Sequence, residues 1–338
     1  MHEAQGLRAI RCHRNFCEDV LVAHRADADR DPKARRMPWH YAPQRRPGQL
    51  LSLLFLTHAP STGNVMTRIL DYTGRDADRT VTVAGIVALK HSGRQLAQVT
   101  AATAAEAAAA ETAGIEMVVC MASAVPAVRQ GSQRVFVTAA IDFGGAVTLD
   151  ELLGTALQAL TDGADAVITA RRLDAVRLLA EEDIPVMGHL GFVPKKSTLY
   201  GGVRMVGKTA DEAVLLWKKF EQLEEAGAFA VECELIPAKV MTEINARTGL
   251  ATISLGSGPA ADVLFVFSSD ICGESERRPR HARAYGDLAS LHAQVEAERV
   301  RALSAFRADV ASGNYPNDAE MGRIDATEME RFITSFDS

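Results

Sequence analysis

The stretch Ile184–Thr209 reads IPVMGHLGFVPKKSTLYGGVRMVGKT. It begins with a short apolar run, which is followed by His189 between two glycines. The rest of the stretch is rich in glycine and lysine. An apolar run that ends in glycine and polar residues is typical of a buried strand followed by a functional loop. Further along the chain, a second apolar run, Ala230–Cys233, ends directly at Glu234. Two predicted strands therefore end in residues that can transfer protons.

From Thr80 onward, short apolar runs alternate with longer helix-forming runs. The apolar runs predict strands at Leu96–Thr100, Met117–Met121, Val135–Ala139, Ala166–Thr169, Val186–Gly188, Ala230–Cys233, Thr252–Leu255 and Val263–Phe267. The other runs predict helices at Thr103–Ala113, Leu149–Thr161, Leu173–Glu182, Ala210–Ala226 and Ala238–Arg247. Apolar strands separated by helices indicate a parallel sheet covered on both faces. Because there are eight such strands, we expect an α/β fold of the (β/α)8 TIM barrel type with a C-terminal helical extension.

The composition changes along the chain and suggests four segments. Residues 1–65 are rich in arginine and proline without hydrophobic periodicity, which predicts a disordered extension, with Met66 as an alternative start. Residues 80–275 would form the barrel. Residues 276–313 contain a long amphipathic run, Leu288–Val310, which predicts one helix or a pair of helices. The polar tail, 314–338, has no predicted secondary structure.

Composition excludes several classes of partner. The formal net charge is −6 and no basic face is visible, which argues against nucleic acid. The longest apolar run, Leu50–Leu56, is far too short to cross a membrane. Five scattered cysteines do not suit a disulfide framework and indicate a reducing, cytoplasmic compartment. The glycine-rich fingerprints of nucleotide sites are missing. We expect a cytoplasmic enzyme whose partner is a small molecule.

The stretch Ile184–Thr209, together with Glu234 and Pro237 of VECELIP, resembles the signature region of the ketopantoate (3-methyl-2-oxobutanoate) hydroxymethyltransferase family. The resemblance spans Thr80–Ser269. It implies a barrel of the phosphoenolpyruvate mutase/isocitrate lyase group that assembles into homo-oligomers. It also implies a reaction of pantothenate biosynthesis, the transfer of a hydroxymethyl group from 5,10-methylenetetrahydrofolate to a 2-oxo acid, with Mg²⁺ as the metal.

The resemblance also assigns roles to residues at the C-terminal ends of strands, where barrel enzymes carry their active sites. Glu234 corresponds to the base that removes the C3 proton of the 2-oxo acid. Ser123 and His189 correspond to residues that contact the substrate. Glu232 lies on the same strand face as Glu234 and is a second candidate. The loop with Lys195, Lys196, Arg204 and Lys208 resembles one that closes over the site.

Four positions depart from the family pattern. The residues aligned with its three metal-binding carboxylates are Ala122, Ala140 and Ala170, and the residue aligned with its substrate lysine is Ile168. Mg²⁺ requires oxygen ligands, which methyl groups do not offer. Loss of a Lewis acid worth several kcal/mol would slow enolate formation by roughly a thousandfold.

Nearby residues offer substitutes for the lost ligands. Asp142 lies two residues after Ala140 and could bind the metal from a displaced position. Arg171 or Arg172 could bind a substrate carboxylate with two hydrogen bonds and offset the enolate charge without a metal. Two alternatives to the family reaction remain open. One is a metal-independent C–C lyase or aldolase acting on another 2-oxo or dicarboxylic acid, and the other is an inactive barrel with a binding or assembly role.

Overall fold

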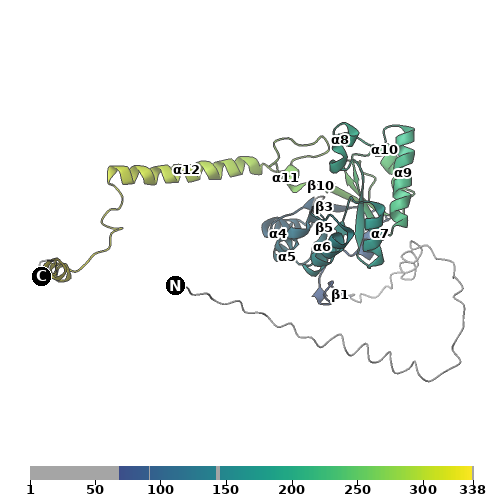
Figure 1. The fold of residues 1–338 in the computed structure, drawn as a ribbon. Coiled ribbons are helices and arrows are strands. Elements are labelled where there is room, and N and C mark those ends of the chain that lie inside the picture. Colours follow the sequence, from purple (N-terminus) through teal and green to yellow (C-terminus); the bar gives the residue numbers. More distant parts are fainter. Residues whose placement is uncertain (1–67, 91, 142–144, 337–338) are drawn as a thin grey trace, which may run out of the picture. The chain divides into compact units, whose positions relative to one another are not determined.

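A closed barrel of eight parallel strands forms the centre of the chain (Figure 1). The computed structural model describes residues 68–90, 92–141 and 145–336, so the predictions for residues 1–65 and Asp142 lie outside the described residues. The strands follow one another around the barrel in the order β10-β3-β4-β5-β6-β7-β8-β9. They are β3 Leu96–Thr100, β4 Met117–Met121, β5 Phe136–Ala140, β6 Ala166–Ile168, β7 Val186–Gly191, β8 Ala230–Glu234, β9 Ala251–Leu255 and β10 Val263–Val266. The predicted barrel is confirmed, with the strand ends moved by a few residues.

Helices flank the barrel between most consecutive strands (Figure 1). They are α4 Ala104–Thr112, α5 Val125–Gly131, α6 Leu149–Thr161, α7 Leu173–Glu181, α9 Ala210–Glu225 and α10 Ala238–Asn245. Helix α5 is not predicted from the sequence, because VPAVRQG is too short to show a helical period. The shorter elements are the β1 Ile69–Leu70 and β2 Asp76–Ala77 hairpin, α3 Val83–Val87, η1 Ala122–Ala124, η2 Pro194–Lys196, α8 Ser197–Tyr200 and α11 Ser268–Ile271. Strands β9 and β10 are joined by residues 256–262 without a helix, so the alternation is interrupted there.

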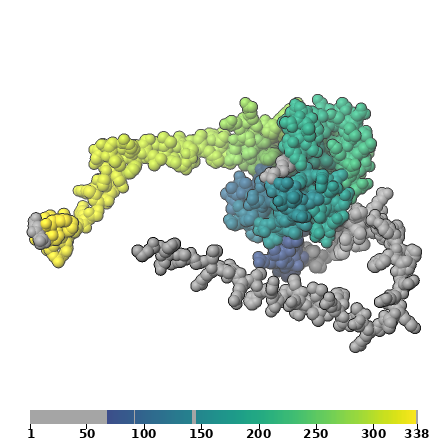
Figure 2. Space-filling view, in the orientation of Figure 1, coloured from purple at the N-terminus to yellow at the C-terminus, as the bar shows by residue number. Residues whose placement is uncertain are grey.

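Two apolar clusters result from the alternation of side chains along each strand. Met117 and Val119 of β4 belong to the cluster that fills the barrel. Val118 and Cys120 of the same strand belong to the cluster between the barrel and its helices. The side chains of β3 to α10 pack into one continuous body (Figure 2). The barrel interior is thus a packed apolar core.

Local signals in the sequence explain where several helices start and stop. Thr103 caps α4 and forms a capping box with Glu106, and Thr148 does the same for α6 with Glu151. The junctions GIEMVV and GADAVI place a glycine with positive φ between a helix and the next strand, as Gly163 with φ 109° illustrates. These caps fix the lengths of the helices and therefore the points at which the strands begin.

After the short helix α11, two longer helices follow the barrel in sequence. Helix α12 runs without interruption over Leu288–Ser312, so the predicted C-terminal extension is one helix and not a pair. Helix α13, Ala326–Thr334, lies in the tail for which no secondary structure is predicted. In the described ranges, no helix is both long enough and apolar enough to cross a membrane.

A buried ionic cluster joins the N-terminal ends of β5 and β6. Asp165 binds Arg129 at 2.6 Å and Arg79 at 2.6 Å, and its carboxylate also accepts a hydrogen bond from the Val137 N–H at 2.8 Å. The guanidinium of Arg129 additionally donates to the carbonyl oxygens of Gly163 and Val135. Because both arginines are nearly fully buried, Asp165 is the counter-charge that compensates for their burial.

We predict that Asp165→Asn lowers the free energy of unfolding by about 3 kcal/mol, because it leaves two buried arginines without a counter-charge. Asp174→Asn provides the matched control, since Asp174 forms its ion pairs with Arg172 and Arg177 at the surface. That change is expected to cost less than about 1 kcal/mol. Urea unfolding followed by circular dichroism measures both values, and equal costs for the two variants would contradict the prediction.

Candidate functional site

A pocket of about 480 Å³ lies at the C-terminal ends of the strands. This is the end at which barrel enzymes carry their active sites. Its walls come from β3 to β10 and the segments that follow these strands. The residues that line it are Thr100, Ala101, Ala102, Glu106, Val119, Cys120, Met121, Ala140, Ile141, Ile168, Ala170, His189, Pro194, Glu232, Glu234, Leu255, Phe265, Phe267, Ser268, Ser269 and Glu274.

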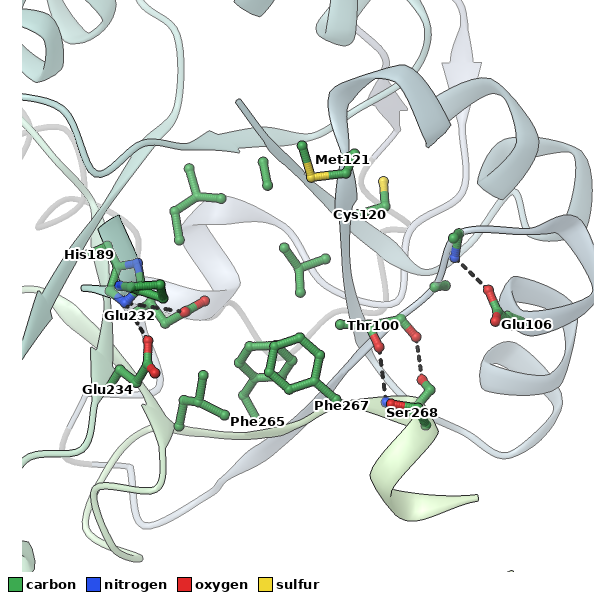
Figure 3. A pocket seen from close by; sticks show the side chains of 18 of the residues that line it. Thr100, Glu106, Cys120, Met121, His189, Glu232, Glu234, Phe265, Phe267 and Ser268 are labelled. Atoms are coloured by element: carbon green, nitrogen blue, oxygen red, sulfur yellow. Dashed lines mark hydrogen bonds and ion pairs between the residues drawn. The ribbon is translucent and has the colours of Figure 1, made fainter. Parts of the chain in front are cut away.

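His189, Glu232 and Glu234 meet on one side of this pocket (Figure 3). The Nε2 atom of His189 lies 3.0 Å from Oε2 of Glu234 and 3.7 Å from Oε1 of Glu232. The side chains are 8%, 14% and 8% exposed for His189, Glu234 and Glu232. The structure thus brings His189 and Glu234 into contact, and Glu232 lies beside them.

The pairing of β7 with β8 brings these three side chains together. His189 is directly opposite Glu232, and Gly191 is directly opposite Glu234. At the end of β8, Leu235 adopts a positive φ of 49°. The bend is held by hydrogen bonds from the Phe192 N–H to the Glu234 carbonyl and from the Val206 N–H to the Leu235 carbonyl. The backbone of Glu234 is thus fixed from both sides.

Gly191 allows this close approach of the two strands. It has φ 87°, and a Cβ atom at this position would lie 2.1 Å from the carbonyl oxygen of Glu234. Any larger residue would have to move the backbone that carries Glu234. Gly191, two residues after His189, is therefore required for the geometry of the site.

The surroundings shift the pKa values of two of the three groups. Burial opposes the charge on His189, but the hydrogen bond to Glu234 and the charges of both carboxylates outweigh it, so the pKa of His189 is raised. Burial also raises the pKa of Glu232; His189 works against this rise and the charge of Glu234 adds to it. Each shift thus results from burial together with the charges of the two neighbouring groups.

The wall formed by β4, β5 and β6 is apolar. Met121, Ala140 and Ala170 line the pocket there, and Ala122 begins η1 directly after β4. Figure 3 shows Cys120 and Met121 across the cavity from His189. At the positions predicted for the metal-binding carboxylates, the described residues offer no oxygen ligand from a side chain. The residues present at that wall do not fit Mg²⁺.

The other predicted substrate residues lie away from the pocket lining. Ser123 is exposed on η1. The guanidinium of Arg171 donates to the carbonyl oxygens of Ala146 and Val147, and Arg172 pairs with Asp174 at the surface. The predicted ligand Asp142 lies outside the described residues. Of the residues proposed from the sequence for catalysis or substrate contact, the described lining includes Glu234, His189 and the second candidate, Glu232.

Several polar lining residues are missed by the sequence reasoning. Ser268 donates from its N–H to Thr100 Oγ1 at 2.9 Å, which ties the end of β10 to the end of β3. Glu106 accepts hydrogen bonds from the N–H groups of Ala102 and Thr103, and Glu274 also lines the pocket. Thr100 and Ser268 end or follow predicted strands, so the rule of strand ends could have identified them.

The charges around the pocket are mostly negative. Four glutamates line it: Glu106, Glu232, Glu234 and Glu274. Within the described part of the chain, the lining contains neither lysine nor arginine, and His189 supplies the only side chain that can carry a positive charge. An anionic ligand in this pocket would be stabilised by a further positive charge.

The family model and the curated relatives that match the chain share one enzyme name. A family model described as ketopantoate hydroxymethyltransferase matches residues 120–318. The 3-methyl-2-oxobutanoate hydroxymethyltransferase of Roseiflexus sp. (strain RS-1) is 30% identical, over 75% of this chain and 98% of the relative. The enzyme of the same name from Hyperthermus butylicus is 31% identical, over 75% of this chain and 95% of the relative. A solved structure of phosphonopyruvate hydrolase is similar with a TM-score of 0.43 and 14% identity, over 75% of this chain and 95% of that one.

We predict that Gly191→Ala displaces Glu234 and destabilises the protein by about 2–4 kcal/mol, from the positive φ and the contact with the Glu234 carbonyl. Gly201→Ala is the matched control, because Gly201 has φ 73° but a Cβ there would have nothing within 4 Å. The control is expected to cost only about 1 kcal/mol. Thermal and urea unfolding measure the difference, and equal costs would mean that the contact with Glu234 is unimportant.

Proposed function

Because this chain belongs to the ketopantoate hydroxymethyltransferase family, we propose that it is an enzyme that adds a hydroxymethyl group to a 2-oxo acid, with 3-methyl-2-oxobutanoate as the first candidate substrate. The observation that carries this proposal is the position of Glu234. Its carboxylate lies at the C-terminal end of β8, lines the pocket and is hydrogen-bonded to His189. A carboxylate held in this way at a barrel strand end is suited to act as a general base.

In the proposed reaction, Glu234 removes the proton from C3 of the 2-oxo acid. The apolar neighbours Leu255 and Phe265 line the same pocket and limit the water around the reacting carbon. His189 orients the Glu234 carboxylate through the contact at 3.0 Å. Its raised pKa favours the imidazolium form, which places a positive charge beside the negative charge of the forming enolate.

Water cleaves both C–N bonds of the methylene group of 5,10-methylenetetrahydrofolate, so that each of the two folate nitrogens takes one proton of the water and the one-carbon unit leaves as formaldehyde. The enolate carbon adds to the carbon of formaldehyde, and the resulting alkoxide takes up the proton that Glu234 removed, which gives the hydroxymethyl group. No step passes through Mg²⁺ at Ala140 and Ala170, because these residues do not fit the ion. The described lining of the pocket has the volume and the apolar surface for a small branched 2-oxo acid.

We predict that the protein catalyses exchange of the C3 proton of 3-methyl-2-oxobutanoate in D₂O without folate, and that Glu234→Gln lowers the rate by at least about a hundredfold. Proton NMR of the substrate measures the rate directly. Glu243→Gln is the matched control, since Glu243 is an exposed glutamate on α10 that pairs with Arg247. Unchanged exchange in Glu234→Gln would show that another group is the base.

A second candidate is a C–C lyase or aldolase reaction on another 2-oxo or dicarboxylic acid. Ala140 and Ala170 favour it, because they remove the ligands with which the family reaction is associated. Both candidates use a base at Glu234, but only the hydroxymethyltransferase forms a hydroxymethylated product with 5,10-methylenetetrahydrofolate. Proton exchange without that product would favour the second candidate, and absence of any binding of 2-oxo acids would favour an inactive barrel.

The exposed apolar side chains of α12 support assembly into a homo-oligomer. Leu291, Val295, Leu303, Phe306 and Val310 are between 49% and 63% exposed. They recur every three to eight residues and lie within one half of the helix circumference. A stripe of this kind is typical of a helix that packs against another protein surface.

We predict that Leu303→Glu combined with Phe306→Glu lowers the molar mass measured by light scattering, because two charges would interrupt the apolar stripe. Ala297→Glu is the matched control, since Ala297 lies on the opposite side of α12 and is exposed as well. A mass that stays the same in the double variant would exclude the stripe as an assembly surface.

A further inference from the structure

We propose that His189, Glu232 and Glu234 bind one divalent first-row transition ion. This site would lie at β7 and β8, across the pocket from the apolar wall where the family resemblance implies Mg²⁺. The inference deepens the proposed function, on which it rests for the role of the ion, whereas ion binding itself can be measured without any reaction.

The distances among the three groups suit a common ion. Their ligand atoms all lie within 4.8 Å of one another. The separation of 3.0 Å between His189 Nε2 and Glu234 Oε2 is what two adjacent ligands show when each is about 2.1 Å from an octahedral ion. The separation of 3.7 Å between His189 Nε2 and Glu232 Oε1 is also within the range that one ion can span with small side-chain rotations.

The burial of the Glu232 carboxylate also points to a bound ion. Its side chain is 8% exposed, yet among the described residues its carboxylate makes no hydrogen bond, and its nearest partner is His189 at 3.7 Å. Buried carboxylates are costly unless they are paired and hydrogen-bonded or bind a metal. Glu232 points into the pocket and lacks the hydrogen bonds that would explain it as a structural residue. A bound ion accounts for its position.

The types of ligand indicate the class of ion. One imidazole and two carboxylates form a mixed nitrogen and oxygen set, which suits Mn²⁺, Fe²⁺, Co²⁺ or Zn²⁺ better than Mg²⁺. The ion would also supply the positive charge that the glutamate-lined pocket needs in order to hold a 2-oxo acid anion. Its binding would release protons from the ligands, as metal sites in proteins do.

Glu234 can serve both as a ligand of the ion and as the base of the proposed reaction. A 2-oxo acid that coordinates the ion through its carboxylate and carbonyl oxygens needs two ligand positions. Glu234 is the more exposed carboxylate, 14% against 8% for Glu232, so it is the ligand that the incoming acid would displace. Displacement would leave Glu234 beside the bound acid and free to accept its proton.

The test is a titration of the full-length, chelator-treated protein with Mn²⁺, in which the EPR signal of free Mn²⁺ is measured. We expect saturable binding of about one ion at this site and a loss of affinity of at least about tenfold in Glu232→Gln. Glu243→Gln is the matched control, because Glu243 is an exposed glutamate on α10 that does not line the pocket. It is expected to bind Mn²⁺ as the unchanged protein does.

Absence of Mn²⁺ binding in the unchanged protein, or equal affinity in Glu232→Gln, would overturn the inference. Circular dichroism of each variant checks that it folds. The visible absorption of Co²⁺ bound to the unchanged protein gives a second measurement that needs no variant; an octahedral or five-coordinate spectrum is expected, and a thiolate charge-transfer band would place the ion elsewhere. Ion binding without proton exchange would refute the proposed reaction alone, and Glu234-dependent exchange without ion binding would refute the ion alone.

Discussion

The pairing of β7 with β8 is the constraint on which the site depends. Side chains alternate along a strand, so a shift of one residue in this register would turn one strand's set of side chains away from the pocket. The observed register places His189 opposite Glu232 and Gly191 opposite Glu234. Gly191 lets the strands approach at the point where β8 bends, and the bonds at Phe192 and Val206 hold that bend. One register therefore determines the positions of all three ionisable groups.

The pocket divides into two chemically different walls as a result. Strands β7 and β8 carry the ionisable groups, whereas β4, β5 and β6 present Met121, Ala140 and Ala170. A reaction that forms an enolate needs both a base and a stabilising positive charge. In the proposed reaction, both functions lie on the same wall, through Glu234, His189 and the ion proposed beside them. The apolar wall would then contact the carbon chain of the substrate and exclude water.

Much of this arrangement could be predicted from the sequence, because strands and strand ends leave strong local signals. The eight apolar runs identify the barrel, and VECELIP and the glycines around His189 identify the end at which the site lies. The sequence could not predict which groups the long side chains contact. Arg171 looked suitable for binding a carboxylate, but its guanidinium reaches back to the carbonyl oxygens of Ala146 and Val147. Such contacts depend on loop geometry and have no periodic signature.

The burial of Glu232 lowers the stability of the fold, and this cost points to a role other than packing. An apolar side chain at this position would pack against its neighbours in the barrel, and a carboxylate without hydrogen bonds weakens the fold. The same cost does not apply to Asp165, whose two arginines and hydrogen bond from Val137 compensate for its burial. The two buried carboxylates thus differ in their contacts. The described residues supply ion-pair and hydrogen-bond partners for Asp165, but no hydrogen-bond donor for Glu232. For Asp165 the partner belongs to the protein, and the reason for its burial is structural. For Glu232 the described residues supply no hydrogen-bond partner, and the pocket into which it points is where the proposed ion would bind.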